Sequence, residues 1–147
     1  MKPSIKIHGV KQLEIKLRHT ADRVADSARK TMHRGAANIL KEAQLNAPVD
    51  EHNLEKSLRI ERTTGIRGRL ELTIVMGGFV GNVNVDRYAV EVHEHYSSMG
   101  VGPGTQAKRL ANPGRYIGEK FLERAAKDGE AKLLAAMIST VKKEWKI

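Results

Sequence analysis

The feature that most constrains the fold is a long run of helical periodicity near the start of the chain, from Val10 to Ala47. Apolar or small side chains recur there every three or four positions, which places them on one side of an α-helix opposite the charged residues. At about 1.5 Å per residue, such a helix would be roughly 55 Å long. It is expected to end before Pro48, because the residue that precedes a proline is displaced from the helical region. The apolar stripe consists of Val10, Leu13, Leu17, Ala21, Val24, Ala28, Met32, Ala36, Ile39 and Ala43.

This stripe is narrow and rich in alanine, so the helix over 10–47 is expected to pack closely against a sheet or a neighbouring helix. Its length exceeds what a compact domain of this size needs. Two interpretations therefore remain open. The run is a scaffold helix within one subunit, or part of it packs against another copy of the chain.

The rest of the chain combines short apolar patterns with one long aperiodic stretch. Period-two alternation predicts strands at 4–8 and 87–93 and an antiparallel hairpin over 57–76. Residues 96–114 show no periodicity and contain several glycines and prolines, so we expect a long flexible loop. A helix is predicted over 115–146.

Together these elements predict a single α+β domain over residues 1–147. In this fold, a long N-terminal helix and a C-terminal helix pack on a small, mainly antiparallel sheet. With 40% hydrophobic and 29% charged residues, the chain has the composition of a globular protein. The absence of cysteine excludes disulfides and thiolate metal ligands, and no apolar run approaches the roughly 18 residues of a membrane span. No apolar signal segment follows the first four residues. We therefore expect a soluble protein of a reducing cytoplasm.

The net charge of +9 favours a polyanionic partner or an acidic protein surface. Basic residues concentrate around the predicted hairpin, where they either form a solvated face or face nucleic acid such as DNA. Aromatic residues, which stack on bases, make up only 4% of the chain. The possible DNA-facing residues are Lys56, Arg59, Arg62, Arg67 and Arg69.

The most enzyme-like pattern is Glu91, His93 and His95. Residues two apart on a strand share a face, so the three could present one carboxylate and two imidazoles to zinc or iron. The alternative is a solvated strand end, which is favoured because no further ligand cluster supports a metal. No nucleophile elbow, phosphate loop or HExxH motif is present. We therefore assign no catalytic residue, no metal site and no cofactor.

Three segments, in the right order, resemble head–tail joining proteins of tailed bacteriophages. The sequence NAPVD at 46–50, with Asn53-Leu54 and Ser57-Leu58 after it, resembles that family's "APVDTGxLRxS" segment. The sequence YAVEVHE at 88–94 resembles its "YAxxVHE" segment. The sequences GPGTQAK at 102–108 and GEKFLERA at 118–125 resemble its "GxxAK…GxKFLERA" stretch. The likeness covers residues 4–126, and the order of elements also fits. The chain departs from the pattern where Glu51-His52 replaces Thr-Gly and where His95-Tyr96-Ser97 replaces the "fGT" ending.

The resemblance implies a neck, tail-completion or minor tail protein of the virion, which assembles in the host cytoplasm. Such a protein is structural rather than catalytic. It would form a homo-oligomeric ring, of about six or twelve copies, between the portal or connector and the tail-tube or tail-terminator proteins. Genomic DNA would pass through the channel of that ring, and no membrane would be involved.

The long loop would then be an assembly arm that is ordered only against other subunits or the connector. Its partner-binding residues would be Tyr96, Gly102, Pro103, Lys108, Arg109, Arg115 and Tyr116. Two other functions stay open on the sequence alone: a basic nucleic-acid-binding module that uses the hairpin, and a metal-dependent hydrolase that uses Glu91, His93 and His95.

Overall fold

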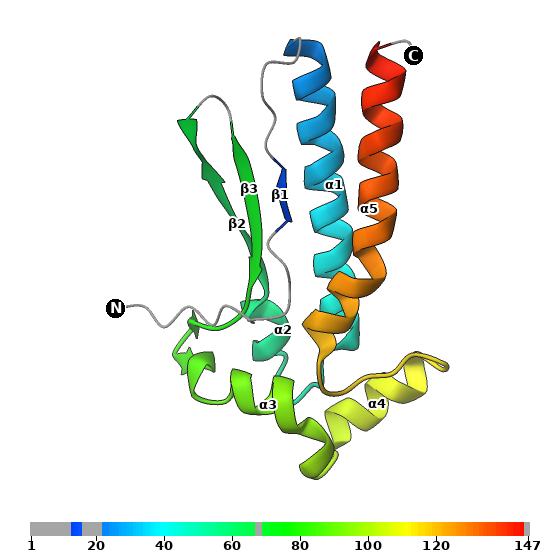
Figure 1. Cartoon of the computed structure of the whole chain (residues 1–147). Coiled ribbons are helices and arrows are strands. Elements are labelled where there is room, and N and C mark those ends of the chain that lie inside the picture. Colours follow the sequence, from blue (N-terminus) through cyan, green and yellow to red (C-terminus); the bar gives the residue numbers. More distant parts are fainter. Residues whose placement is uncertain (1–12, 16–21, 67–68, 146–147) are drawn as a thin grey trace.

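The chain has an α+β fold in which two long helices stand beside a small antiparallel sheet, above a cluster of short elements (Figure 1). The structure is a computed structural model and describes residues 13–15, 22–66 and 69–145. The predicted fold class is therefore confirmed. The strand expected at 4–8 lies outside the described residues.

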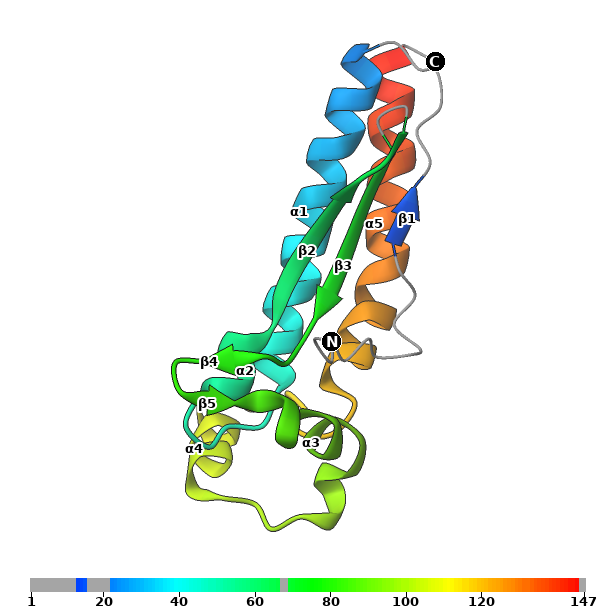
Figure 2. The ribbon, with the colours of Figure 1, turned by 90° about the vertical axis from the view of Figure 1, so that its left-hand side faces the viewer.

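The two long helices are α1 (Asp22–Asn46) and α5 (Phe121–Trp145), which run antiparallel and side by side (Figures 1 and 2). The buried positions of α1 follow the predicted stripe from Val24 to Ala43 at intervals of three and four. The helix does not span 10–47, however, because Leu13–Ile15 forms strand β1. Leu13 and Ile15 pair with Leu72 and Leu70 of the sheet. Sheet pairing thus overrides a helical periodicity that these residues also satisfy.

Two glycines bring the long helices into close contact. A methyl group at Gly35 of α1 would lie 2.3 Å from Leu133 Cδ1, and one at Gly129 of α5 would lie 2.5 Å from Ile39 Cγ1. Each helix thus receives a branched side chain from the other in the space that a missing Cβ leaves. Toward the N-terminal end of α1 and the C-terminal end of α5, the hydroxyls of Thr31 and Thr140 lie 2.9 Å apart. Gly129 does not interrupt α5, which continues from Phe121 to Trp145.

Replacing Gly35 with valine is expected to lower the free energy of unfolding by about 2 kcal/mol, because Leu133 cannot keep its position beside the new side chain. Ala37→Val is the matched control, since it places the same residue at an exposed position of α1 and should cost only about 0.5 kcal/mol. Urea denaturation followed by circular dichroism measures both. Equal losses in the two variants would contradict the close glycine contact.

The sheet has the order β1-β3-β2, with β3 (Leu70–Val75) between β1 and β2 (Arg59–Thr64). Leu70, Leu72 and Ile74 of β3 are buried in the core shared with α1. Strand β2, by contrast, is exposed or half-exposed along its whole length. The hairpin expected over 57–76 therefore has one buried strand and one strand on the surface.

The lower end of the molecule in Figure 1 contains short elements only: α2 (Asn53–Ser57), β4 (Phe79–Val80), β5 (Val83–Asn84), η2 (Val85–Arg87), α3 (Ala89–His95), η3 (Tyr96–Ser98) and α4 (Pro103–Ala111). The strand predicted at 87–93 is wrong, because most of this segment is helical. Its buried residues are Ala89 and His93, which are four apart as a helix requires. A pattern of five residues is too short to separate the two periods.

The loop predicted over 96–114 and the helix predicted over 115–146 also need correction. Residues 96–98 and 103–111 form η3 and α4, and α4 has Pro103 in its first turn, where a missing N–H costs no hydrogen bond. Helix α5 begins only at Phe121, since Lys120 has a left-handed φ of 56° that a continuing helix excludes. The 112–120 segment is the connection between the two helices.

Candidate functional site

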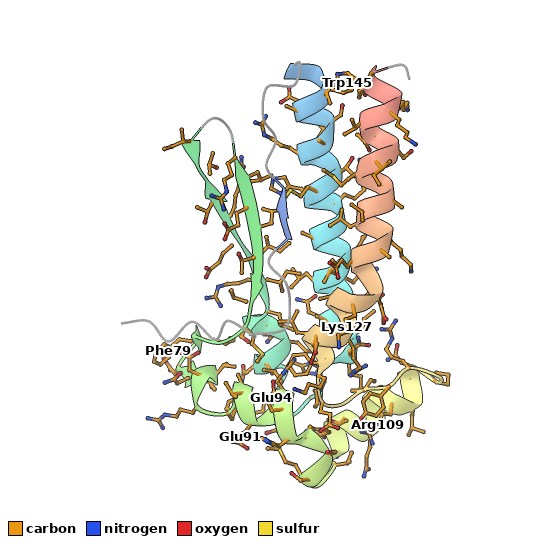
Figure 3. All side chains as sticks on the ribbon, viewed as in Figure 1. Phe79, Glu91, Glu94, Arg109, Lys127 and Trp145 are labelled. Atoms are coloured by element: carbon orange, nitrogen blue, oxygen red, sulfur yellow. The ribbon has the colours of Figure 1, made fainter. Side chains whose placement is uncertain are left out.

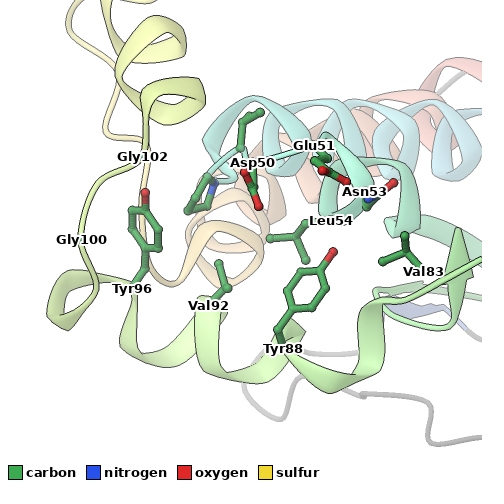
Figure 4. Close-up of a pocket in the computed structure, with 12 residues that line it drawn as sticks. Asp50, Glu51, Asn53, Leu54, Val83, Tyr88, Val92, Tyr96, Gly100 and Gly102 are labelled. Carbon is green, nitrogen blue, oxygen red and sulfur yellow. The ribbon is translucent and has the colours of Figure 1, made fainter.

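A groove of about 520 Å³ lies between α3 and the turn that connects α1 to α2 (Figure 4). Helix α3 and η3 contribute side chains on one side of the groove, and the turn contributes two carboxylates on the other. The apolar and aromatic lining comprises Pro48, Val49, Leu54, Val83, Tyr88, Val92 and Tyr96. The carboxylates belong to Asp50 and Glu51. The site thus combines an apolar lining with a negative rim.

The turn that carries these carboxylates has the backbone shape that glycine favours. His52 adopts the left-handed conformation, with φ 63° and ψ 5°, at the position where the resembled family segment has glycine. Its Nδ1 lies 3.2 Å from Glu55 Oε2, and its carbonyl accepts the Lys56 N–H at 3.1 Å. His52 therefore replaces the glycine of the family pattern but has the left-handed backbone conformation that glycine favours.

Tyr88 is a groove-lining aromatic residue whose phenol is influenced by the charges of the acidic rim. Burial raises the pKa of its phenol, and the negative charges of Asp50 and Glu51 raise it further. Among the described residues, neither carboxylate has an ion-pair or hydrogen-bond partner, and the Tyr88 hydroxyl has no hydrogen-bond partner. The groove can therefore accept a positive group at its rim and donate or accept a hydrogen bond from its lining.

The Glu91, His93 and His95 set does not form a metal site, because α3 is a helix rather than a strand. His93 is fully buried, whereas Glu91 and His95 are exposed and their nearest polar atoms are 3.7 Å apart. Figure 3 places Glu91 and Glu94 on α3 at the lower end of the molecule. Within the described ranges, no group of three His, Cys, Asp or Glu side chains could hold a metal ion. The hypothesis of a metal-dependent hydrolase required Glu91, His93 and His95 to share one face of a strand, and the helix does not provide that arrangement.

His93 instead joins α3 to the start of α5. Its ring meets Phe121 edge-on at 4.8 Å, its Nδ1 lies 3.0 Å from Glu94 Oε1, and its carbonyl accepts the Lys120 N–H at 2.7 Å. Glu94 also forms an ion pair with Lys120. Within the described part of the chain, His93 Nε2 is buried without a partner.

Stability is expected to fall on mild acidification because of His93. Burial lowers the pKa of its imidazole, against the smaller opposing effect of Glu94, so the unfolded chain binds this proton more readily than the folded one. The stabilisation from the neutral ring is therefore present near neutral pH and is lost as pH falls below about 6.5. Melting temperatures between pH 7.5 and 5.5 should fall less in His93→Leu than in the wild type. His95→Leu, at an exposed position of the same helix, is the control, and equal slopes for all three proteins would contradict this role.

The basic residues of the hairpin have different roles. Arg59 donates to the carbonyl of Gly77 at 2.8 Å and to that of Ser57 at 3.1 Å, which ties the base of the hairpin together. Arg69 lies 3.4 Å from Glu71. Lys56 and Arg62 are exposed and have no described ion-pair partner, and Arg67 lies outside the described residues. Of the predicted DNA-facing set, Lys56 and Arg62 are thus the described cations left available to a partner.

Several of the expected arm residues are engaged within the subunit. Tyr96 is buried, and its hydroxyl donates to Thr105 Oγ1 at 3.0 Å. Lys108 reaches the carbonyls of Gln44 and Ala47 and the carboxylate of Glu55. Helix α4 is therefore docked on the C-terminal end of α1 and on α2.

The residues around α4 complete this attachment. Arg109 donates to the Ile117 carbonyl at 2.8 Å, and Arg115 donates to Glu42 and Asn46 of α1 at 2.8 Å each. Tyr116 is half exposed, with the Arg124 guanidinium 4.6 Å from its ring centre. Gly102 caps the start of α4 and lines the groove, next to Pro103.

Sequence reasoning missed the acidic rim and two exposed apolar side chains. Asp50 belongs to the motif at 46–50 and Glu51 follows it, but no local signal in the sequence reveals that α3 lies opposite them. Leu110 on α4 is 84% exposed and Ile66 at the end of the hairpin is 88% exposed. An isoleucine inside a glycine- and arginine-rich turn is the signal that could have indicated a contact residue.

Comparison with known proteins gives a match to a protein-family model. A family model named HK97-gp10-like, described as "Bacteriophage HK97-gp10, putative tail-component", matches residues 11–95, which is more than half of the chain. The match runs from just before β1 to the end of α3, and it includes the groove's turn and the hairpin. No curated protein and no solved structure gives a significant match. None of the described helices is long and apolar enough to cross a membrane.

Proposed function

The chain belongs to the HK97-gp10-like family of bacteriophage tail components, and from this membership we propose that it is a subunit of a ring at the head–tail junction. Family membership makes it a structural protein of the virion. The finer proposal is a neck or tail-completion ring between the portal or connector and the tail, around the channel through which DNA passes. The observation that carries the proposal is the family match over β1, α1, the hairpin and α3.

Features of the surface support assembly rather than catalysis. The hairpin presents an exposed strand, β2, and an exposed apolar end at Ile66. The groove presents carboxylates that have no partner within the described part of the chain, beside apolar side chains. Exposed apolar positions and unpaired charges of both signs are what a subunit with several partner surfaces requires. We propose that the docked α4 and the 112–120 connection, including Tyr116 and Leu110, form a further contact surface toward the portal or tail.

Native mass spectrometry of the purified protein, alone and mixed with the portal and tail proteins of the same phage, tests this function. The expected result is one oligomer of fixed stoichiometry, either from the chain alone or on addition of one partner. A chain that stays monomeric in every mixture would contradict the proposal. A nucleic-acid-binding module remains the second candidate, and it is favoured if the monomer binds DNA with an affinity that falls steeply with salt.

A further inference from the structure

We propose that the groove between α3 and the α1–α2 turn receives the end of the β2–β3 hairpin from a second copy of the chain. The inserted segment is Arg62–Ile66, here named the hairpin end. In this contact, Ile66 enters the apolar part of the groove and Arg62 meets Asp50 and Glu51 at the rim. The inference rests on the proposed function, because it specifies how neighbouring subunits of the ring hold one another.

The groove has the chemistry to receive such a segment. Its volume of about 520 Å³ exceeds one isoleucine side chain and lies within the range of ligand-binding clefts. Val83, which is 36% exposed, and Leu54 and Val92 supply apolar contact area. The Tyr88 hydroxyl has no hydrogen-bond partner among the described residues and is available to a backbone group of the guest. Asp50 and Glu51, which have no ion-pair or hydrogen-bond partner among the described residues, favour a cationic guest.

The hairpin end has the complementary chemistry. At 88% exposure, Ile66 is the most exposed large apolar side chain of the described residues. Arg62 on the exposed strand β2 has no described ion-pair partner. Arg62 lies on β2, which ends at Thr64, whereas Ile66 lies in the turn that follows, so the cation and the apolar side chain occupy different parts of the hairpin end. The hairpin end thus carries an apolar side chain and a cation, and the groove carries an apolar lining and an acidic rim.

The contact must be made between molecules. Figures 1 and 2 show the hairpin end and α3 at opposite ends of the elongated subunit, so a hairpin cannot reach the groove of its own chain. A copy that donates its hairpin to one neighbour and accepts the hairpin of another forms a heterologous, head-to-tail interface. Interfaces of this type close into rings when the rotation between neighbours permits. The same contact would therefore be repeated between all neighbouring subunits of the ring.

Helix α5 offers a competing apolar face. Leu134, Ile138 and Trp145 are exposed and recur at helical spacing on it. Two copies joined through this face would form an isologous dimer, with the same residues on both sides. This α5 face serves as the control surface.

The absence of cysteine from the chain makes a disulfide test specific. A protein with Ile66→Cys is mixed with one carrying Val83→Cys under mild oxidation. The expected result is a covalent dimer in the mixture, and a ladder or closed ring when both substitutions share one chain, because a disulfide requires Cα atoms within about 7 Å. Ile66→Cys mixed with Ile138→Cys is the matched control and should give no dimer. Preferential linkage to Cys at 138 would overturn the proposed contact.

Charge reversal provides an independent readout. Asp50→Lys with Glu51→Lys should weaken self-association about tenfold or more, as should Arg62→Glu, and combining the three substitutions should restore much of it. Glu91→Lys is the control, since it changes the charge of an exposed α3 residue outside the groove lining. Circular dichroism establishes that each variant folds. If all variants oligomerise like the wild type, the hairpin contact is overturned but the proposed ring is not. If the wild type stays monomeric in all mixtures, both proposals are overturned.

Discussion

Replacing Lys108 with methionine is expected to lower the free energy of unfolding by about 3 kcal/mol. The ammonium group of Lys108 donates to the carbonyls of Gln44 and Ala47 at 2.6 and 2.7 Å and pairs with Glu55. The side chains of both ionised partners are mostly buried, at 13% and 20% exposure. Methionine keeps the packing volume but leaves a carboxylate and two carbonyls without their donor, which is the costly way to break such a pair.

Chemical denaturation of Lys108→Met measures this loss. Lys127→Met is the control, because Lys127 pairs with Glu123 on the surface of α5 and exposed ion pairs contribute less than about 0.5 kcal/mol. Proteolysis within residues 103–111 should also become faster in Lys108→Met, since the lysine attaches α4 to the end of α1. A variant as stable as the wild type would show that the α4 attachment does not depend on Lys108.

Thr105→Val is expected to cost a similar amount, about 3 kcal/mol, although valine has almost the same shape. Thr105 Oγ1 accepts the Val49 N–H at 2.9 Å and the Tyr96 O–H at 3.0 Å, and it donates to the Val49 carbonyl at 3.1 Å. All three groups are buried. Valine would leave them without partners inside the protein, where an unmade hydrogen bond is most costly.

Thr105→Ser keeps the hydroxyl and should recover most of the stability, with a remaining loss of about 1 kcal/mol for the deleted methyl group. Comparing the two variants by urea denaturation separates the hydrogen bonds from the packing. If serine and valine cost the same, the hydroxyl network does not hold α4 in place.

Both predictions concern a segment that sequence reasoning described as a flexible loop. The hydrogen bonds that fix it join Thr105 to Val49 and Lys108 to Gln44, so each connects residues more than fifty positions apart. Periodicity and turn chemistry describe neighbours along the chain and carry no information on such partners. Gly104 adds a close approach of the same kind, since a Cβ there would lie 2.8 Å from the Val49 carbonyl oxygen. Deletion of 97–111 would therefore remove part of the folded subunit.

The long helix was predictable over the part in which its apolar stripe is buried. From Val24 to Ala43 the stripe is buried as expected, because α5 and β3 cover that face. Before Asp22 the same periodicity fails, since Leu13–Ile15 pairs with β3. Pairing with a strand almost sixty residues away is a tertiary effect that a local pattern cannot show. The α+β class followed from the sequence, but the start of α1 did not.

The candidate site was predictable in part as well. The motif at 46–50 led to the family and to the turn that bears Asp50, but the opposite side of the groove is α3, which the sequence pattern described as a strand. On a strand, His93 would face the same side as Glu91, whereas on α3 it is buried against Phe121. Because the segment was interpreted with the strand period of two residues instead of the helical period of 3.6, the sequence indicated a metal cluster that does not form and gave no indication of the groove.

As a member of a tail-component family, this chain is a structural part of the phage particle. Quantitative mass spectrometry of purified particles, assembled from the genome that encodes the chain, measures whether complete particles contain it. We predict peptides of this chain in complete particles at one fixed, low copy number, about six or twelve per particle, as a single ring requires. Complete, infectious particles that contain none of this chain would contradict it.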